Sequence, residues 1–186
     1  MTTIQKNYSE RSVQETDISE HFPTLKKYSQ ECQTIVEMGV RLVYSTWALL
    51  AGLEGKEKTK LISIDILHPL EQGGSLHQVV EACKESKIEF EFRKENTLEN
   101  KIEEVDLLFI DTLHNYVQLS EELRRHSPMV KKYIILHDTE KCKTVGDDGE
   151  RGMQEAIDEF LDINKEWKMI EYFTNCYGLT VLGRLK

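Results

Sequence analysis

The sequence has few cysteines, no long apolar run and too few basic residues to balance its acids. Its cysteines stand far apart with no CxxC pair, which fits free thiols better than a disulfide framework or a zinc site. No apolar run could span a bilayer and the polar opening MTTIQKNYSERS is unlike a signal peptide, so we expect a cytoplasmic protein. The net charge of -9 argues against nucleic acid and anionic membranes as partners.

The length and composition predict one soluble globular domain over residues 1–186, with 39% hydrophobic and 31% charged residues. Residues 1–22 are polar and show no clear period. They are either a frayed arm or a helix that folds over a ligand, and the sequence does not separate these alternatives. A core over residues 32–185 follows, in which strand and helix patterns alternate.

The strand patterns predict an α/β fold with a Rossmann-like, mostly parallel sheet of seven strands. Four continuous apolar runs have the character of buried parallel strands, and alternation at 88–92 indicates a half-buried edge strand. The last two strand-like runs are joined by a short turn and predict a C-terminal antiparallel hairpin. Helices should cover both faces of the sheet. The expected strands are 34–38, 61–67, 88–92, 105–111, 133–138, 167–173 and 178–184.

A strand, a glycine turn and a helix start follow one another over residues 34–53. We expect the turn at Gly39 and a helix near Ser45, whose hydroxyl would cap its first free backbone N–H groups. The positive end of that helix suits a carboxylate or phosphate, and a glycine lets a ligand approach the backbone. An ordinary strand-to-helix connection explains the segment equally well.

Three of the buried strands end in aspartate, at Asp65, Asp111 and Asp138. In an open α/β sheet the ligand lies at the carboxyl ends of the strands, so these side chains should gather at one edge. Any one of them could instead be a solvated strand end or a helix cap. The three together predict a polar site at this edge.

These motifs, in this order, resemble those of class I S-adenosylmethionine-dependent methyltransferases. The likeness is to the small O-methyltransferase-like group near the antibiotic-sugar and rhamnosyl O-methyltransferases, and it covers about residues 32–185. It is carried by Glu37-Met-Gly39, by Tyr44-Ser45, by Asp65, by the runs VDLLFIDTLHNY and YIILHDT, and by the final hairpin. Val43 stands where that family has its second glycine, so the tightness of the turn is in question.

The resemblance implies a role for each part of the site. Glu37 and Gly39 would line the methionine part of S-adenosylmethionine, with Ser45 near its carboxylate. Asp65 would accept the ribose hydroxyls. Asn96 and Thr97 would flank the adenine. Asp111, with His114 beside it, would lie near the amino or sulfonium end of the cofactor and near the substrate.

Methyl transfer to a hydroxyl needs an aligned oxygen and a way to remove its proton. His114 is one candidate for the base, because an unperturbed imidazole is largely neutral at pH 7. Alternatively, Asp111 and Asp138 end neighbouring strands and could share Mg²⁺ or Mn²⁺, with His137 as a third ligand or a second base.

We therefore expect an O-methyltransferase acting on a small molecule or glycan, most simply at a sugar hydroxyl. The competing hypotheses are an NAD-binding oxidoreductase domain and a methyltransferase-fold protein that binds a partner without catalysis. A single glycine in place of GxGxxG and the terminal hairpin disfavour the first, and the presence of Asp65, Asp111 and His114 disfavours the second. The sequence leaves open whether the protein forms a homo-oligomer.

Overall fold

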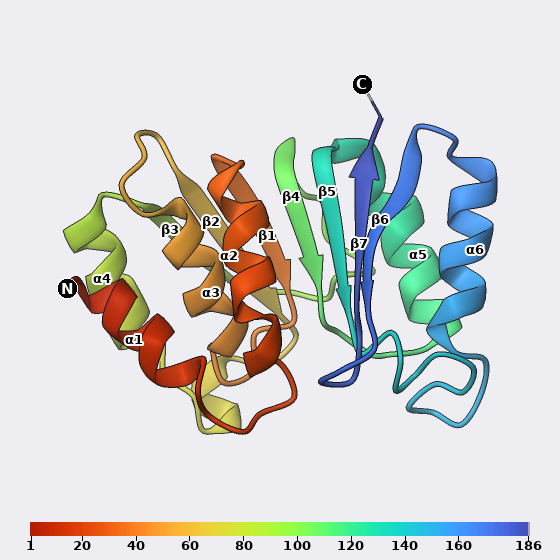
Figure 1. The fold of residues 1–186 in the computed structure, drawn as a ribbon, viewed down its shortest axis with the longest axis horizontal. Helices are drawn as coiled ribbons and strands as arrows, with labels where there is room; N and C mark the ends of the chain where they lie inside the picture. The colour runs from red at the N-terminus through yellow and green to blue at the C-terminus, as the bar shows by residue number, and fades with distance from the viewer. Residues whose placement is uncertain (186) are drawn as a thin grey trace.

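The computed structural model describes residues 1–185, whose seven strands form one sheet in the order β3-β2-β1-β4-β5-β7-β6 (Figure 1). β1 to β5 are parallel, and β7 runs antiparallel between β5 and β6. The predicted fold class and the C-terminal hairpin are therefore confirmed. The strands are β1 Thr34–Met38, β2 Lys60–Asp65, β3 Glu89–Lys94, β4 Val105–Ile110, β5 Val130–His137, β6 Trp167–Phe173 and β7 Leu179–Arg184.

Residues 1–185 also form six α-helices and three short 3-10 turns. The helices are α1 Thr3–Arg11, α2 Phe22–Gln30, α3 Tyr44–Leu53, α4 His77–Ser86, α5 Tyr116–His126 and α6 Met153–Ile163, and the 3-10 turns are η1 Ser19–His21, η2 Pro69–Gln72 and η3 Ser127–Met129. Within residues 1–185 none of the helices is both long and apolar enough to cross a membrane.

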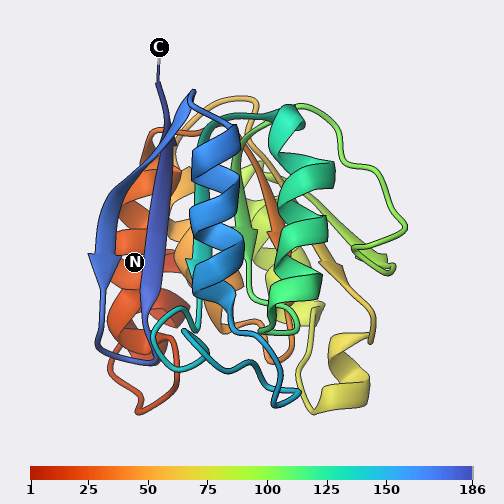
Figure 2. The same cartoon turned by 90° about the vertical axis from the view of Figure 1, so that its right-hand side faces the viewer.

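The sheet separates two hydrophobic cores because successive strand residues point to opposite faces. In β1, Ile35 packs with residues of α1 to α4, whereas its neighbour Val36 packs with residues of α5 and α6. Figure 2 shows α5 and α6 side by side over their face of the sheet. Helices thus cover both faces, as predicted.

The chain reverses its direction of travel across the sheet at β1. It moves outward through β2 to the edge strand β3, then returns to place β4 on the other side of β1. Ligands of open α/β sheets bind at such a switch point, outside the carboxyl ends of the strands. These ends lie along the lower edge of the sheet in Figure 1.

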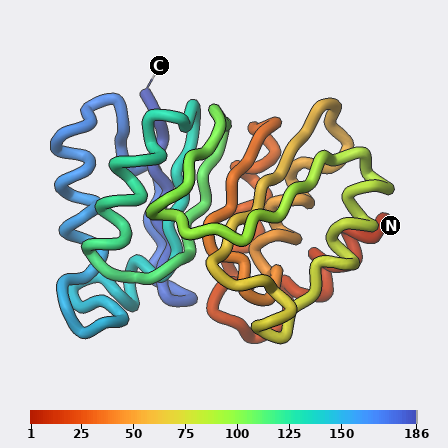
Figure 3. The backbone as a smooth tube through the Cα atoms, turned by 180° about the vertical axis from the view of Figure 1, so that it is seen from behind, coloured from red at the N-terminus to blue at the C-terminus, as the bar shows by residue number. Residues whose placement is uncertain are grey.

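The N-terminal segment packs on the body of the protein. Ile4 of α1 and Ile18 belong to the core on the α1 to α4 face, and the Thr3 hydroxyl donates a 2.8 Å hydrogen bond to Glu85 of α4. The views from both sides place the N-terminus beside α4 (Figures 1 and 3). The end of this segment, at residues 16–18, reaches the carboxyl edge of the sheet and lines a cavity there.

Candidate active site

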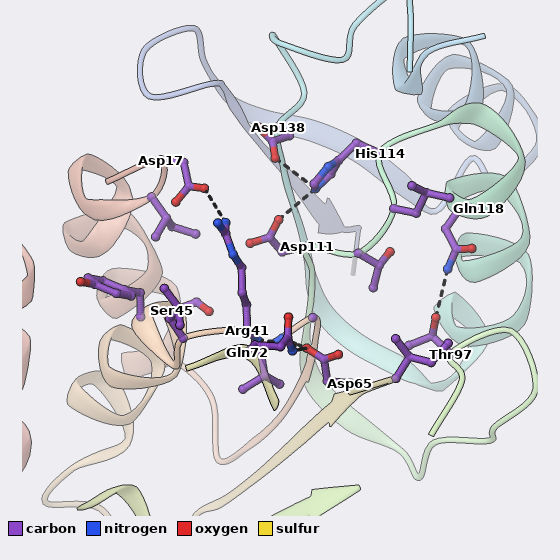
Figure 4. A pocket seen from close by; sticks show the side chains of 18 of the residues that line it. Asp17, Arg41, Ser45, Asp65, Gln72, Thr97, Asp111, His114, Gln118 and Asp138 are labelled. Atoms are coloured by element: carbon purple, nitrogen blue, oxygen red, sulfur yellow. Dashed lines mark hydrogen bonds and ion pairs between the residues drawn. The ribbon is translucent and has the colours of Figure 1, made fainter. Parts of the chain in front are cut away.

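A cavity of about 710 Å³ lies at the switch point, with walls from the N-terminal segment and from the loops after β1 to β5 (Figure 4). This volume lies within the range of small-molecule and cofactor sites. Of the residues singled out in the sequence, those that line it are Gly39, Ser45, Asp65, Asn96, Thr97, Asp111, His114 and Asp138.

The turn after β1 brings the backbones of two strands together. Gly39 has a φ of +85°, and a Cβ placed on it would lie 1.8 Å from the carbonyl oxygen of Asp111. Glycine is thus required by the approach of the chain after β4. Val43, where the family pattern has glycine, adopts the left-handed conformation with a φ of 59°, a strained geometry for a β-branched residue. The turn therefore forms without a second glycine.

Ser45 has a different role from the one predicted. No side chain within the described residues caps α3, and the Ser45 hydroxyl instead donates a 2.6 Å hydrogen bond to Glu37. The predicted cap is therefore wrong, because a buried carboxylate is the stronger acceptor.

Glu37, expected beside the ligand, lies behind the cavity wall and is fully buried. Its carboxylate also accepts hydrogen bonds from Ser63 at 2.6 Å and Thr46 at 2.9 Å. Burial raises the pKa of Glu37 to about 7, although the hydroxyl donors oppose the rise. Of this cluster it is Ser45 that faces the cavity.

Asp65, the last residue of β2, organises the loop that follows β1. Its Oδ2 accepts hydrogen bonds from the backbone N–H groups of Val40 at 2.8 Å and Arg41 at 3.0 Å, and its Oδ1 accepts one from Leu67 at 2.9 Å. A carboxylate has about four acceptor sites, so Oδ1 keeps one for a ligand. The side chain of Arg41 extends toward Asp17, to which it is ion-paired at 3.1 Å (Figure 4).

His114 lies at the centre of a cluster of acids. Its Nε2 is 3.0 Å from Oδ1 of Asp111 and 3.1 Å from Oδ2 of Asp138 (Figure 4). Its Nδ1 is 2.7 Å from Oδ2 of Asp147. Burial lowers the pKa of His114, but hydrogen bonding and charge from Asp111, with the other acids, outweigh it and raise the pKa overall. Asp111, His114 and Asp138 lie together as predicted, whereas Asp147, which comes from the loop after β5, was not predicted from the sequence.

His137 lies behind this cluster and is buried. Its Nδ1 is 3.2 Å from Oδ1 of Asp111 and its Nε2 is 2.8 Å from the backbone carbonyl of Asp17. Burial opposes a charge here, but the carboxylates of Asp111 and Asp138 raise the pKa of His137 to about 9. Both ring nitrogens therefore face acceptors, and the role of His137 as a third metal ligand or a second base stays a prediction.

The carboxyl pKa values of Asp111 and Asp138 shift in opposite directions. Burial disfavours the charge of Asp111, but His137 and His114 outweigh it and lower its carboxyl pKa. At Asp138 burial dominates and raises the pKa. Asp138 also has a φ of 58°, and its Oδ1 is buried without a hydrogen-bond partner in the described part of the chain. Strained backbone and orphaned buried oxygens are concentrated at functional sites.

One ligand atom from each of Asp111, His114 and Asp138 lies within 4.8 Å of the other two, a set that could hold a metal ion. Oxygen and imidazole ligands suit Mn²⁺, and carboxylate oxygens suit Mg²⁺. Asp65 lines the same cavity but is not part of this set. The three strand-end aspartates thus divide between the two ends of one cavity (Figure 4).

Asn96 and Thr97 follow β3 and form the wall beyond Asp65. The Asn96 side chain accepts a 3.0 Å hydrogen bond from the backbone of Leu98, which closes a local turn. Thr97 is held by Glu122, a fully buried residue of α5 that sequence analysis did not single out. Next to Glu121 on a charged helix, Glu122 has the sequence signature of a solvated acid, and only its spacing of four from Gln118 hints at a shared face.

No protein-family model matches the chain, and no curated protein matches it in sequence. Its fold is similar to solved structures. An O-methyltransferase from Bacillus cereus in complex with S-adenosylhomocysteine is 15% identical, with a TM-score of 0.68 and coverage of 99% of this chain and 90% of that one. The O-methyltransferase TomG from Streptomyces achromogenes, involved in tomaymycin synthesis and in complex with S-adenosylmethionine, is 14% identical, with a TM-score of 0.63 and coverage of 97% and 90%.

The S-adenosylhomocysteine-bound methyltransferase PaMTH1 from Podospora anserina is also similar, with 15% identity, a TM-score of 0.61 and coverage of 99% of this chain and 88% of that one. At such identities the likeness shows the fold. The chain therefore has a Rossmann-like fold of the kind found in these methyltransferases.

Proposed function

We propose that this protein is an S-adenosylmethionine-dependent O-methyltransferase. The observation that carries the proposal is one cavity that joins two unlike ends (Figure 4). One end holds the strand-to-helix turn and Asp65, and the other holds the cluster of Asp111, His114 and Asp138. The fold shared with methyltransferases solved with S-adenosylmethionine or S-adenosylhomocysteine supports the same assignment.

The cavity residues suit the parts of this cofactor, which supplies an electrophilic methyl group when bound. The free acceptor site on Asp65 would take a ribose hydroxyl. The start of α3, with no side-chain cap among the described residues, would receive the methionine carboxylate near Gly39 and Ser45. Asn96 and Thr97 would border the adenine, and Asp111 would lie toward the reacting end.

The acceptor hydroxyl would bind at the cluster of acids and His114. Asp111, His114 and Asp138 fit a divalent cation, Mg²⁺ or Mn²⁺, and the orphaned Oδ1 of Asp138 is a further oxygen ligand. Such an ion lowers the pKa of a hydroxyl that binds it. The alternative activator is His114 itself, acting as the base. The orphaned Oδ1 of Asp138 beside this three-residue set favours the cation.

We further propose that the acceptor is a hydroxyl of a sugar or glycan. Asp17 and Arg41 line the same cavity as Asp138 of the cluster. Charged donors and acceptors so close together suit a ligand with several hydroxyl groups, each of which both donates and accepts.

Thermal unfolding tests the cofactor assignment. S-adenosylhomocysteine should raise the Tm of the wild type, since a ligand that binds only the folded state stabilises it. Asp65→Ala should lose most of this shift, whereas Asp158→Ala on α6, away from the cavity, should keep it. No shift with the wild type, or an equal shift from NAD, would exclude the methyltransferase assignment.

Transfer of a labelled methyl group tests the acceptor. We expect label in a panel of free and nucleotide-linked sugars when Mg²⁺ or Mn²⁺ is present. Label that enters only aromatic hydroxyls would leave the methyltransferase assignment intact and contradict the sugar assignment.

A further inference from the structure

Glu122 is a buried charged group that the proposed reaction does not use. It lies on α5 with no exposed surface, and its carboxylate accepts hydrogen bonds from three side chains. Burial raises the pKa of Glu122, and these donors oppose the rise. The three donors, Thr97, Thr112 and Gln118, all line the cavity.

The hydrogen-bond distances define which atom donates in each contact. Thr97 Oγ1 is 2.6 Å from Glu122 Oε1, a length typical of a hydroxyl that donates to a carboxylate. Thr112 Oγ1 is 2.9 Å from both carboxylate oxygens. Each hydroxyl has one proton, so the hydroxyl protons of both threonines are used in hydrogen bonds to Glu122.

Gln118 is constrained in the same way. Its Nε2 is 2.8 Å from Glu122 Oε1 and 3.1 Å from Thr97 Oγ1, which uses both of its N–H groups. The opposite orientation of the amide would set its carbonyl oxygen against the carboxylate, which cannot donate. The carbonyl oxygen of Gln118 is therefore the polar atom left for other partners (Figure 4).

The backbone of this wall is held by the same helix. His126 donates a 2.8 Å hydrogen bond from Nε2 to the carbonyl oxygen of Thr97. Gln118, Glu122 and His126 are four residues apart and share one face of α5. The remaining hydrogen-bonding capacity of the Thr97, Thr112 and Gln118 side chains therefore consists of lone pairs.

We propose that Glu122 is a positioning residue that leaves the side chains of Thr97, Thr112 and Gln118 as acceptors, and so selects a ligand carrying an amino group over one carrying an oxo group at the same place. The inference rests on the proposed function, in which this wall borders the purine of the cofactor. A 6-aminopurine donates to the lone pairs of Gln118, Thr97 and Thr112. A 6-oxopurine would place its carbonyl oxygen, which is also an acceptor, against the same lone pairs.

The test compares binding of S-adenosylhomocysteine with binding of S-inosylhomocysteine, its 6-oxo analogue, by calorimetry. The wild type should prefer the amino compound by at least about tenfold in Kd, the value of one well-placed hydrogen bond. In Glu122→Gln the new amide donates toward Thr112 or Thr97 and releases a hydroxyl proton. The preference should fall by about tenfold, and Glu121→Gln, a partly exposed neighbour on the same helix, should keep it.

A second variant covers the case in which Glu122→Gln does not fold. Gln118→Leu removes the free carbonyl acceptor from a half-buried position and should lower the preference in the same direction. Equal affinity of the wild type for the two compounds, or an unchanged preference in both variants, would overturn the role of Glu122 while leaving the methyltransferase assignment standing. Wild type that binds neither compound would overturn both.

Discussion

Nε2 of His137, at the end of β5, donates a 2.8 Å hydrogen bond to the backbone carbonyl of Asp17 in the N-terminal segment. The other nitrogen of the same ring contacts Asp111, so one buried imidazole joins the acids of the site to the segment that covers them. Both contacts require N–H donors, and both nitrogens donate only while the ring is protonated.

The stability of the protein should therefore fall in the alkaline range. The folded-state pKa of His137, about 9, lies above the value near 6.5 of an exposed histidine. Its contribution to the free energy of unfolding is complete below pH 6.5 and is lost as the pH rises through 9, by about 3 kcal/mol. Denaturant unfolding between pH 6 and 10 measures this loss.

His137→Gln should remove that slope, and His77→Gln, at an exposed position on α4, should retain it. Hydrogen exchange at residues 16–21 should also accelerate in His137→Gln. If the stability of His137→Gln depends on pH as steeply as that of the wild type, or if hydrogen exchange at residues 16–21 is unchanged, His137 does not link the site to the N-terminal segment.

The raised pKa of Glu37 predicts that the free energy of unfolding also depends on pH in a lower range. Its folded-state pKa of about 7 lies above the unfolded value near 4.3, so its stabilising contribution is present below pH 4.3 and is lost as the pH rises through 7. Glu37→Gln should gain about 3 kcal/mol relative to the wild type between pH 4 and pH 8. A constant difference between the two proteins over this range would show that Glu37 does not titrate there.

Gly39→Ala should strongly destabilise the fold. The new Cβ would lie 1.8 Å from a backbone oxygen, which forces the chain after β4 to move, and its φ is positive. We expect a loss of at least about 3 kcal/mol. Gly55→Ala is the matched control, with a φ of +79° and no described atom within 4 Å of the added Cβ, and should cost only about 1 kcal/mol. Equal losses would argue against the close approach.

Removal of one carboxylate should weaken cation binding. Asp138→Asn replaces a charged ligand of the candidate cation site with a neutral one, and Mn²⁺ affinity measured by electron paramagnetic resonance should fall at least about tenfold. Asp158→Asn should bind as the wild type does. If wild type shows no site for Mn²⁺, and methyl transfer survives chelation but is lost in His114→Ala, the histidine is the activator instead.

The fold could be predicted from sequence because its signals are local. The runs at 61–67 and 105–111 are mostly apolar and rich in Ile and Leu, a pattern typical of buried parallel strands. Boundaries were less accurate, and β5 begins at Val130, three residues before the predicted strand.

The site could be predicted where it depends on strand ends. Asp111 and Asp138 close adjacent parallel strands, so the sheet itself brings them together. Glu122, Asp147 and Asp17 could not be found in this way. Each reaches the site through a helix face or a loop, and sequence spacing holds no information about where such a residue meets a distant strand.

The conformation of Val43 has a consequence for how this binding loop is stabilised. Its left-handed backbone costs about 1–2 kcal/mol, and its side chain, only 2% exposed, gains about as much by burial in the core. A glycine at position 43 would remove the backbone strain but would lose the buried side chain. Glycine and valine should therefore give nearly equal free energies of unfolding. In this protein the burial of the Val43 side chain in the core holds the loop after β1 in its conformation. A search for glycine-rich sequence signatures would therefore overlook this binding loop.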